Sequence, residues 1–184
     1  MSAPAITGFT GGRPKVQPVV RLFSCLVPKA QVAASIDMGD QTVEAPSWHG
    51  QVFDPATLPQ VGGPLPAADA FARGTRTVPL VQLAWGRSGD KGDAANIGIL
   101  ARKSGYLPFI RAALTEQAVA AWFAHLVKGS VRRFDLPGTH ALNFLLHEAL
   151  GGGGIASVRM DSQGKAFAQM LLDFPVPIPA DMSL

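Results

Sequence analysis

The distribution of proline most strongly limits what this chain can fold into. Between positions 45 and 77 the chain carries five prolines: Pro46, Pro55, Pro59, Pro64 and Pro66. Proline lacks a backbone N–H and fixes φ, so a stretch with a proline every few residues does not form regular helix or sheet. We therefore predict an N-terminal arm and proline-rich linker over 1–77, a folded domain over 78–176 and a tail over 177–184.

Composition narrows the class of protein. Hydrophobic residues make up 47% of the 184 residues, enough for a sizeable core. Charged residues make up only 16%, which predicts that a partner covers part of the surface. The net charge of +3, without a run of Lys or Arg, argues against nucleic acid and fits a small anionic ligand.

The single cysteine, Cys25, excludes an intrachain disulfide framework and a multi-cysteine zinc site. It fits a reducing, cytoplasmic setting. The first residues contain no hydrophobic stretch, so we expect neither a signal peptide nor a membrane span.

Hydrophobic periodicity predicts an α+β sandwich, with two helices on one face of a mainly antiparallel sheet and an extended N-terminal arm. In the arm we expect strands over 19–28, 31–37 and 41–44, the last two joined by a tight turn. Thr115 can cap a helix that Gly129 ends, and a second helix is expected over 140–150. Five strands are expected in the domain, over 78–86, 95–103, 131–136, 155–160 and 166–174.

The segment Arg87–Asp93 packs two cations, two carboxylates, a hydroxyl and two glycines into seven residues, and we expect it to be a loop. Its glycines let backbone N–H groups converge on an anion, while Arg87 and Lys91 add positive charge. The predicted ligand-binding residues here are Arg87, Ser88, Gly89, Lys91, Gly92 and Asn96. Asp90 and Asp93 could orient the cations or bind a metal through water. The alternative is an internally paired loop of little energetic consequence.

A second group is His140, Asn143 and His147, which would share one face of the predicted helix. Either histidine could act as a general base. The favoured alternative is that this polar face is solvated or packs on a partner. No cysteine or carboxylate has matching spacing, so no metal site is predicted.

Two further features are weaker. In the run Gly151–Gly154, Gly152 and Gly153 could let a ligand approach the backbone, or the run could simply end the helix. Arg159, Asp161 and Lys165 are best explained as a charged turn. Ser88 has no adjacent histidine and no GxSxG elbow, so a serine hydrolase is not predicted.

Four blocks of sequence, in this order, resemble the C-terminal region of the acyclic terpene utilisation (Atu) A family: Arg87–Ile99, Phe134–Phe144, Ala149–Gly154 and Val158–Asp173. The resemblance implies a ferredoxin-like sandwich over 78–176 and a role in bacterial catabolism of branched terpenoid acyl-CoA compounds. Members of the family are usually several hundred residues long. The resemblance therefore implies that 1–77 is a remnant of the junction with a larger N-terminal domain.

Two functional hypotheses follow. In the first, the chain is a small subunit or separated C-terminal part of an AtuA-like enzyme acting on a branched acyl-CoA or related carboxylated metabolite, by a hydratase or lyase reaction. Its candidate catalytic residues are His147, Asn143 and Asp90, and no cofactor is expected. In the second, the chain is a noncatalytic module that docks on a larger subunit. Both predict an oligomer, and neither involves nucleic acid or a membrane.

Overall fold

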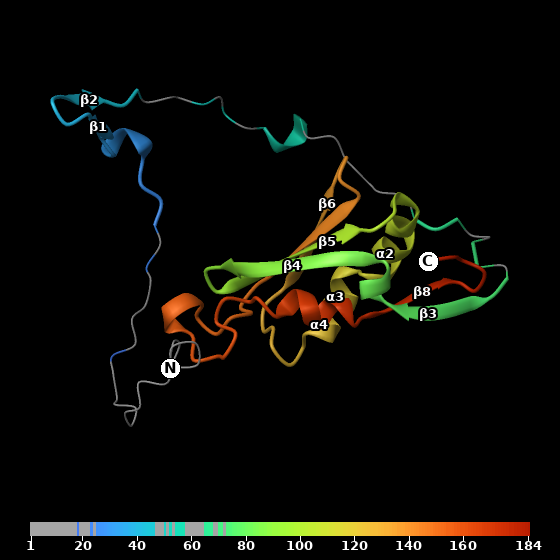
Figure 1. The fold of residues 1–184 in the computed structure, drawn as a ribbon. Coiled ribbons are helices and arrows are strands. Elements are labelled where there is room, and N and C mark those ends of the chain that lie inside the picture. The colour runs from blue at the N-terminus through green and yellow to red at the C-terminus, as the bar shows by residue number, and fades with distance from the viewer. Residues whose placement is uncertain are drawn as a thin grey trace. The chain divides into compact units, whose positions relative to one another are not determined.

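The computed structural model describes residues 18, 23, 25–46, 50, 52, 54–57, 65–67, 70–71 and 73–184 (Figure 1). The chain divides into two units. One comprises Leu22–Gln60, and the other comprises Met1–Arg21 together with Val61–Leu184.

The smaller unit contains a short antiparallel hairpin of β1 (Ser35–Asp37) and β2 (Thr42–Glu44). At its turn the Asp37 carboxylate accepts a hydrogen bond of 2.8 Å from the Gly39 N–H. The strands are shorter than predicted, and all their residues are exposed. Two short 3-10 helices, η1 (Lys29–Gln31) and η2 (Pro55–Thr57), lie on either side of the hairpin along the chain. The prediction of a strand over 19–28 is wrong at Phe23 and 25–28, and its other residues lie outside the described ones.

The larger unit is built on a four-stranded antiparallel sheet in the order β4-β5-β7-β6. A separate antiparallel pair joins β3 to β8 at opposite ends of the domain sequence. The strands are β3 (Thr75–Pro79), β4 (Ala84–Lys91), β5 (Ala94–Ala101), β6 (Val131–Leu136), β7 (Ala141–Leu146) and β8 (Pro175–Pro179). These elements extend slightly beyond 78 at the start and 176 at the end.

In the described part of this unit the α-helices are α2 (Leu107–Ala113), α3 (Glu116–Trp122) and α4 (Phe167–Leu172). Short 3-10 helices lie at η3 (Leu80–Gln82), η4 (Ser104–Tyr106) and η5 (Gly154–Ala156). From β5 to α4 the chain runs strand, helices, strand, strand and helix, which is the β-α-β-β-α part of a ferredoxin-like fold. The strand that would complete this fold next to β5 is β4, which precedes β5 in the sequence. This is a ferredoxin-like arrangement in which the last strand has moved to the front of the sequence. The predicted α+β class is confirmed.

Strand alternation builds the core. Ile97 and Ile99 of β5 and Leu142 and Phe144 of β7 point to the inner face and are fully or almost fully buried. On that face α4 packs close to β4 at Gly86. A Cβ atom added to Gly86 would lie within 3.4 Å of Leu172 and Ala168, so the small glycine allows this close approach. The helices cover one side of the sheet (Figure 1).

One helix start was predicted correctly and one helix was missed. The Thr115 hydroxyl accepts a hydrogen bond of 3.0 Å from the Ala118 N–H and caps α3. The helix ends at Trp122, well before Gly129. Helix α2 has no side-chain cap, and Pro108 near its start is its main local signal.

Two predictions of local structure in the sheet are wrong. The expected loop over 87–93 is mostly strand, because β4 runs to Lys91 and only Gly92 and Asp93 form the turn. Gly92 has a φ of 67°, as required at the first central position of a type II′ hairpin turn. The expected helix over 140–150 is β7, whose Leu142, Phe144 and Leu146 alternate inward between two neighbouring strands.

The last part of the domain also differs. The expected strand over 166–174 is the helix α4, which suits its Ala, Gln, Met and Leu residues. The expected strand over 155–160 contains η5 and irregular chain. In the tail, β8 forms despite its prolines, because it pairs on one side only and buries Val176 and Ile178.

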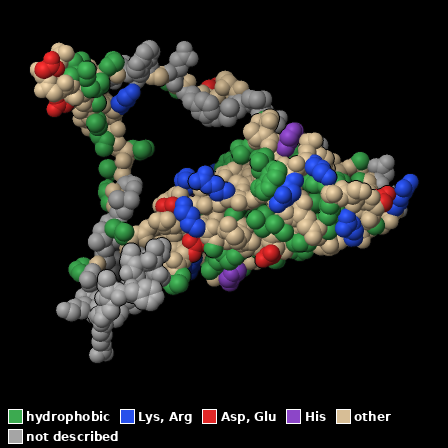
Figure 2. Space-filling model, in the orientation of Figure 1, with side chains coloured by type: hydrophobic (Ala, Val, Ile, Leu, Met, Phe, Trp, Pro, Cys, Tyr) green, Lys and Arg blue, Asp and Glu red, His purple; other side chains and the backbone are tan. Residues whose placement is uncertain are grey.

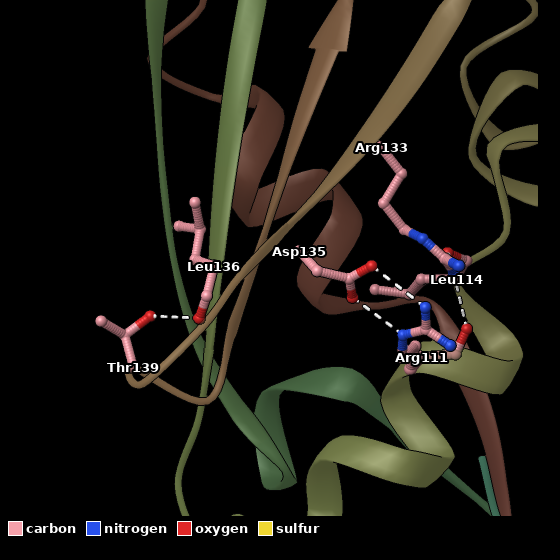
Figure 3. A network of polar contacts seen from close by, with 6 residues as sticks. All are labelled: Arg111, Leu114, Arg133, Asp135, Leu136 and Thr139. Atoms are coloured by element: carbon pink, nitrogen blue, oxygen red, sulfur yellow. Dashed lines mark hydrogen bonds and ion pairs between the residues drawn. The ribbon is translucent and has the colours of Figure 1, made fainter. Parts of the chain in front are cut away.

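A polar network connects α2 to the edge strand β6 (Figure 3). The Arg111 guanidinium donates two hydrogen bonds to the Asp135 carboxylate, at 2.8 and 3.0 Å. Arg133 donates to the carbonyl groups of Arg111 and Leu114, both at 2.8 Å. These side chains close the gap between the helix end and the strand.

We expect Asp135→Asn to lower the free energy of unfolding by about 1–3 kcal/mol, the usual contribution of charge-assisted hydrogen bonds. The side chains of Arg111 and Asp135 are only 12% and 23% exposed. Urea denaturation measures the effect. The matched control is Asp181→Asn, because the Arg73–Asp181 pair is largely exposed and should contribute little. Equal losses in both variants would contradict this account.

The same pair makes stability dependent on pH. The hydrogen bonds from Arg111 hold the pKa of Asp135 below its ordinary value of 3.8, against the opposing effect of burial. A lowered pKa in the folded state contributes stability above the unfolded pKa and loses it as pH falls through the folded pKa. The stability difference between the native chain and Asp135→Asn should therefore be constant near neutral pH and shrink below a pH of about 4. Urea denaturation at a series of pH values tests this.

Candidate functional site

A cavity of about 330 Å³ lies at the free edge of the sheet, along β4. Most of its lining comes from the charged segment that the sequence singled out. The lining residues are Arg87, Ser88, Gly89, Asp90, Lys91, Asn96, Gly98 and Lys165.

The register of β4 and β5 builds the floor of the cavity. Arg87 pairs with Gly98, and Gly89 pairs with Asn96. A Cβ atom on Gly98 would meet only the Arg87 carbonyl oxygen, at 3.8 Å. A Cβ atom on Gly89 would lie 3.5 Å from the Lys165 ammonium and 3.8 Å from the Asn96 side-chain oxygen. The two glycines therefore leave open space between the polar side chains.

Lys165 reaches this floor from another part of the chain, where the sequence predicted only a charged turn. The Asp161 carboxylate accepts hydrogen bonds from the backbone N–H groups of Lys165 and Ala166, at 2.7 and 2.8 Å. The Ser88 hydroxyl donates to the Lys165 carbonyl at 3.2 Å and accepts from the Ala168 N–H at 2.9 Å. These bonds fix the loop against β4, so Ser88 positions Lys165.

The cavity is electropositive. Arg87, Lys91 and Lys165 contribute three cations to the lining, against the one carboxylate of Asp90. Within the described part of the chain, the ion pairs are Arg73–Asp181 and Arg111–Asp135, and neither involves these cations. The Lys91 ammonium donates to the Asp90 carbonyl oxygen at 3.0 Å, which leaves its charge uncompensated. Positive charge around a small open floor suits a carboxylate or phosphate group.

The glycine run Gly151–Gly154 does not line the cavity; it and the residues before it form hydrogen bonds with the β4–β5 turn. The Asp93 carbonyl oxygen accepts from the N–H groups of Ala149 and Leu150, both at 3.0 Å. The Asp93 carboxylate accepts from the Gly152 N–H at 2.7 Å. Gly153 lies so close to the turn that an added Cβ atom would overlap the Gly92 carbonyl oxygen. In this structure Gly92, Gly152 and Gly153 shape the hairpin end, and Asp93 is fully engaged there.

The two histidines and Asn143 do not share a helical face, since they lie in and around β7. His140 is in the β6–β7 turn with a φ of 53°. Asn143 accepts a weak hydrogen bond of 3.4 Å from Asn96, beside the cavity. His147 follows β7, where its N–H donates to the Ser130 carbonyl at 2.9 Å, and it is not part of the lining.

Among the described residues, no three His, Cys, Asp or Glu side chains lie close enough together to hold a metal ion. Among the same residues, no helix is long and apolar enough to cross a membrane.

The fold and the cavity together define an α+β sandwich with a cationic cleft on its edge strand. Residues 78–177, more than half of the chain, match the family described as the AtuA ferredoxin-like domain, and the chain belongs to this family. Comparisons with curated proteins and with solved structures gave no match.

We expect Gly153→Ala to destabilise the domain by more than the roughly 1–3 kcal/mol that a strained backbone conformation alone costs. The new methyl group would force the glycine run away from the Gly92 carbonyl oxygen and weaken its hydrogen bond with Asp93. The matched control is Gly154→Ala. Gly154 also has a positive φ, of 48°, but a Cβ atom there would meet nothing within 4 Å. Thermal unfolding should show the larger loss for Gly153→Ala, and equal losses would contradict the close approach.

Proposed function

We propose that this domain binds a small anionic group in the cavity along β4. The observation that carries the proposal is the convergence of Arg87 and Lys91 of β4 and Lys165 of a distant loop over a floor of two glycines. Arg87 can hold a carboxylate or phosphate through two hydrogen bonds, and the lysines act as point charges. The exposed position of Arg87 and Lys91 leaves them accessible to a ligand.

The size of the cavity limits the ligand. Small-molecule sites usually measure about 300–1,000 Å³, and this cavity of about 330 Å³ is at the lower end. It suits one charged group of a larger molecule, such as a phosphate of a CoA ester or a substrate carboxylate. We therefore propose that the chain acts as a small subunit or separated C-terminal part of an AtuA-like enzyme that processes a branched acyl-CoA or related carboxylated metabolite.

A hydratase or lyase reaction needs a group that moves a proton near the bound substrate. Of the proposed catalytic residues, Asp90 is the one in the lining, so it is the first candidate for this step. Asn143 lies next to the cavity through its contact with Asn96 and could orient a substrate oxygen. His147 does not line the cavity, so it could act on the substrate only if the substrate extended beyond the cavity.

The alternative function is a noncatalytic module that docks on a larger catalytic subunit. The feature that favours it is the exposed hydrophobic side chains on the sheet, among them Trp85 at 51% exposure. In that case the anion in the cavity would be a group of the partner or a ligand that both chains hold.

We expect Lys165→Ala and Arg87→Ala each to weaken binding of CoA or an acyl-CoA by roughly tenfold, because each removes one charge-assisted contact. Calorimetric titration of the full chain measures this, and inorganic phosphate serves as a second probe. The control is Lys128→Ala, which removes an exposed cation outside the lining. Affinity should also fall with added salt.

Unchanged affinity in both cavity variants, or an equal loss in Lys128→Ala, would overturn the proposed site. Binding of the native chain to neither CoA compounds nor phosphate would also overturn it. Turnover of an acyl-CoA that survives Asp90→Asn would exclude Asp90 as the proton-transfer group while leaving the anion site intact.

A further inference from the structure

The sheet has a second face, opposite the helices, and its residues are known from the strand registers. In each strand they alternate with the residues that point to the inner face, toward the core and the helices. We call this the open face. It consists of Trp85, Arg87, Gly89, Lys91, Ala94, Asn96, Gly98, Leu100, Arg132, Phe134, Leu136, Ala141, Asn143 and Leu145.

The open face is too apolar for a face that only meets water. An antiparallel sheet covered on one side normally alternates hydrophobic residues inward with polar residues outward. Here Trp85, Leu100, Phe134 and Leu136 are between 39% and 51% exposed. Trp85 pairs with Leu100, Leu100 with Ala141, and Ala141 with Leu136, so these residues form one band across the four strands.

The charges of the open face are all positive. It carries Arg87, Lys91 and Arg132 and no carboxylate. The Arg132 guanidinium lies 5.3 Å from the centre of the Phe134 ring, and that of the neighbouring Arg102 lies 4.7 Å from the Trp85 ring. Figure 2 shows Lys and Arg side chains among hydrophobic ones over the region of β4 and β5. Exposed aromatic and arginine side chains together, without acidic ones, are typical of the energetically important part of protein interfaces.

We propose that the open face binds an acidic, amphipathic segment of another protein. Apolar side chains of that segment would cover the band around Trp85 and Leu136, while its carboxylates pair with Arg87, Arg102 and Arg132. A second copy of this chain fits poorly, because two open faces would bring like charges together without a carboxylate between them. This inference goes beyond the proposed anion binding, since it concerns a different ligand over a wider surface.

Nucleic acid also fits the open face poorly. Single-stranded recognition by a sheet relies on aromatic side chains that stack on successive bases. The aromatic residues here, Trp85 and Phe134, lie on the two edge strands β4 and β6. The central strands carry Asn96, Gly98 and Asn143 between them. A protein segment with carboxylates at its margins and apolar side chains matches this pattern better.

The size of the open face indicates what kind of segment it can hold. Four strands about 4.8 Å apart, each about 20 Å long, give a footprint of roughly 400 Å². Stable interfaces bury about 800 Å² on each partner. The open face by itself therefore suits a single helix or extended segment, or one part of a larger contact.

The experiment begins with a random peptide library displayed on phage and selected on the full chain. We expect the enriched peptides to combine Asp or Glu with Leu, Phe or Trp. An enriched peptide is then synthesised together with a twin in which each acidic residue is replaced by its amide. Fluorescence anisotropy should show at least about tenfold weaker binding for the twin and for the Arg132→Glu variant. Lys128→Glu is the matched control, a charge reversal outside the open face, and should leave binding unchanged.

The outcomes separate this proposal from the first one. Arg132→Glu should weaken peptide binding but leave CoA and phosphate binding in the cavity intact, because Arg132 lies on the open face and does not line the cavity. The proposal would be overturned if the selection enriched no peptide or enriched peptides without acidic residues. It would also be overturned if the Arg132→Glu variant bound the peptide as tightly as the native chain does. Tighter binding of a labelled 12-nucleotide single strand would overturn it as well, and would indicate nucleic acid. A dimer of the chain alone that Arg132→Glu dissociates would indicate a second copy as the occupant.

Discussion

The candidate site depends on the hydroxyl group of Ser88. This side chain is 8% exposed and points to the inner face of β4. It donates to the Lys165 carbonyl and accepts from the Ala168 N–H, so one group satisfies polar atoms in the loop and at the start of α4. A buried polar group that loses its partners is costly. Ser88 therefore sets the position of Lys165 over the outer face of the same strand and brings a third cation to the cavity.

Strand alternation explains how one short segment serves both packing and binding. Ser88 faces the core, while Arg87, Gly89 and Lys91 face outward. Gly89 and Gly98 are small where the cavity needs space, and the side chains around them carry charge. A loop, as the sequence suggested, would not hold the side chains at these fixed distances. Because β4 is paired with β5 along its length, its charged side chains are held in place before any ligand arrives.

The sequence predicted those parts of the fold and of the candidate site whose signals are local. The cap of α3 at Thr115 and the strand over 131–136 follow from residue type and alternation within a few positions. The segment around Leu142, Phe144 and Leu146 was misread as a helix, because its leucines fit a period of 3.6 as well as a period of 2. The deciding factor is pairing with β5 and β6, which depends on residues far away in sequence. Lys165 was assigned to a charged turn and not to the site for the same reason, since it meets Gly89 only in the folded chain.

The connectivity of the sheet explains why a cavity exists on β4. In this order of strands β4 is an edge strand, and β8, which follows α4, pairs with β3, so no other described strand pairs with the outer edge of β4. An edge strand with one neighbour needs other contacts to hold it in place. Besides the packing of α4 at Gly86, two sets of hydrogen bonds serve here, those of Ser88 near the middle of β4 and those between the glycine run and Asp93 at its end. Because both sets lie beside the edge, they fix β4 without covering the charged side chains, and the edge remains open to a ligand.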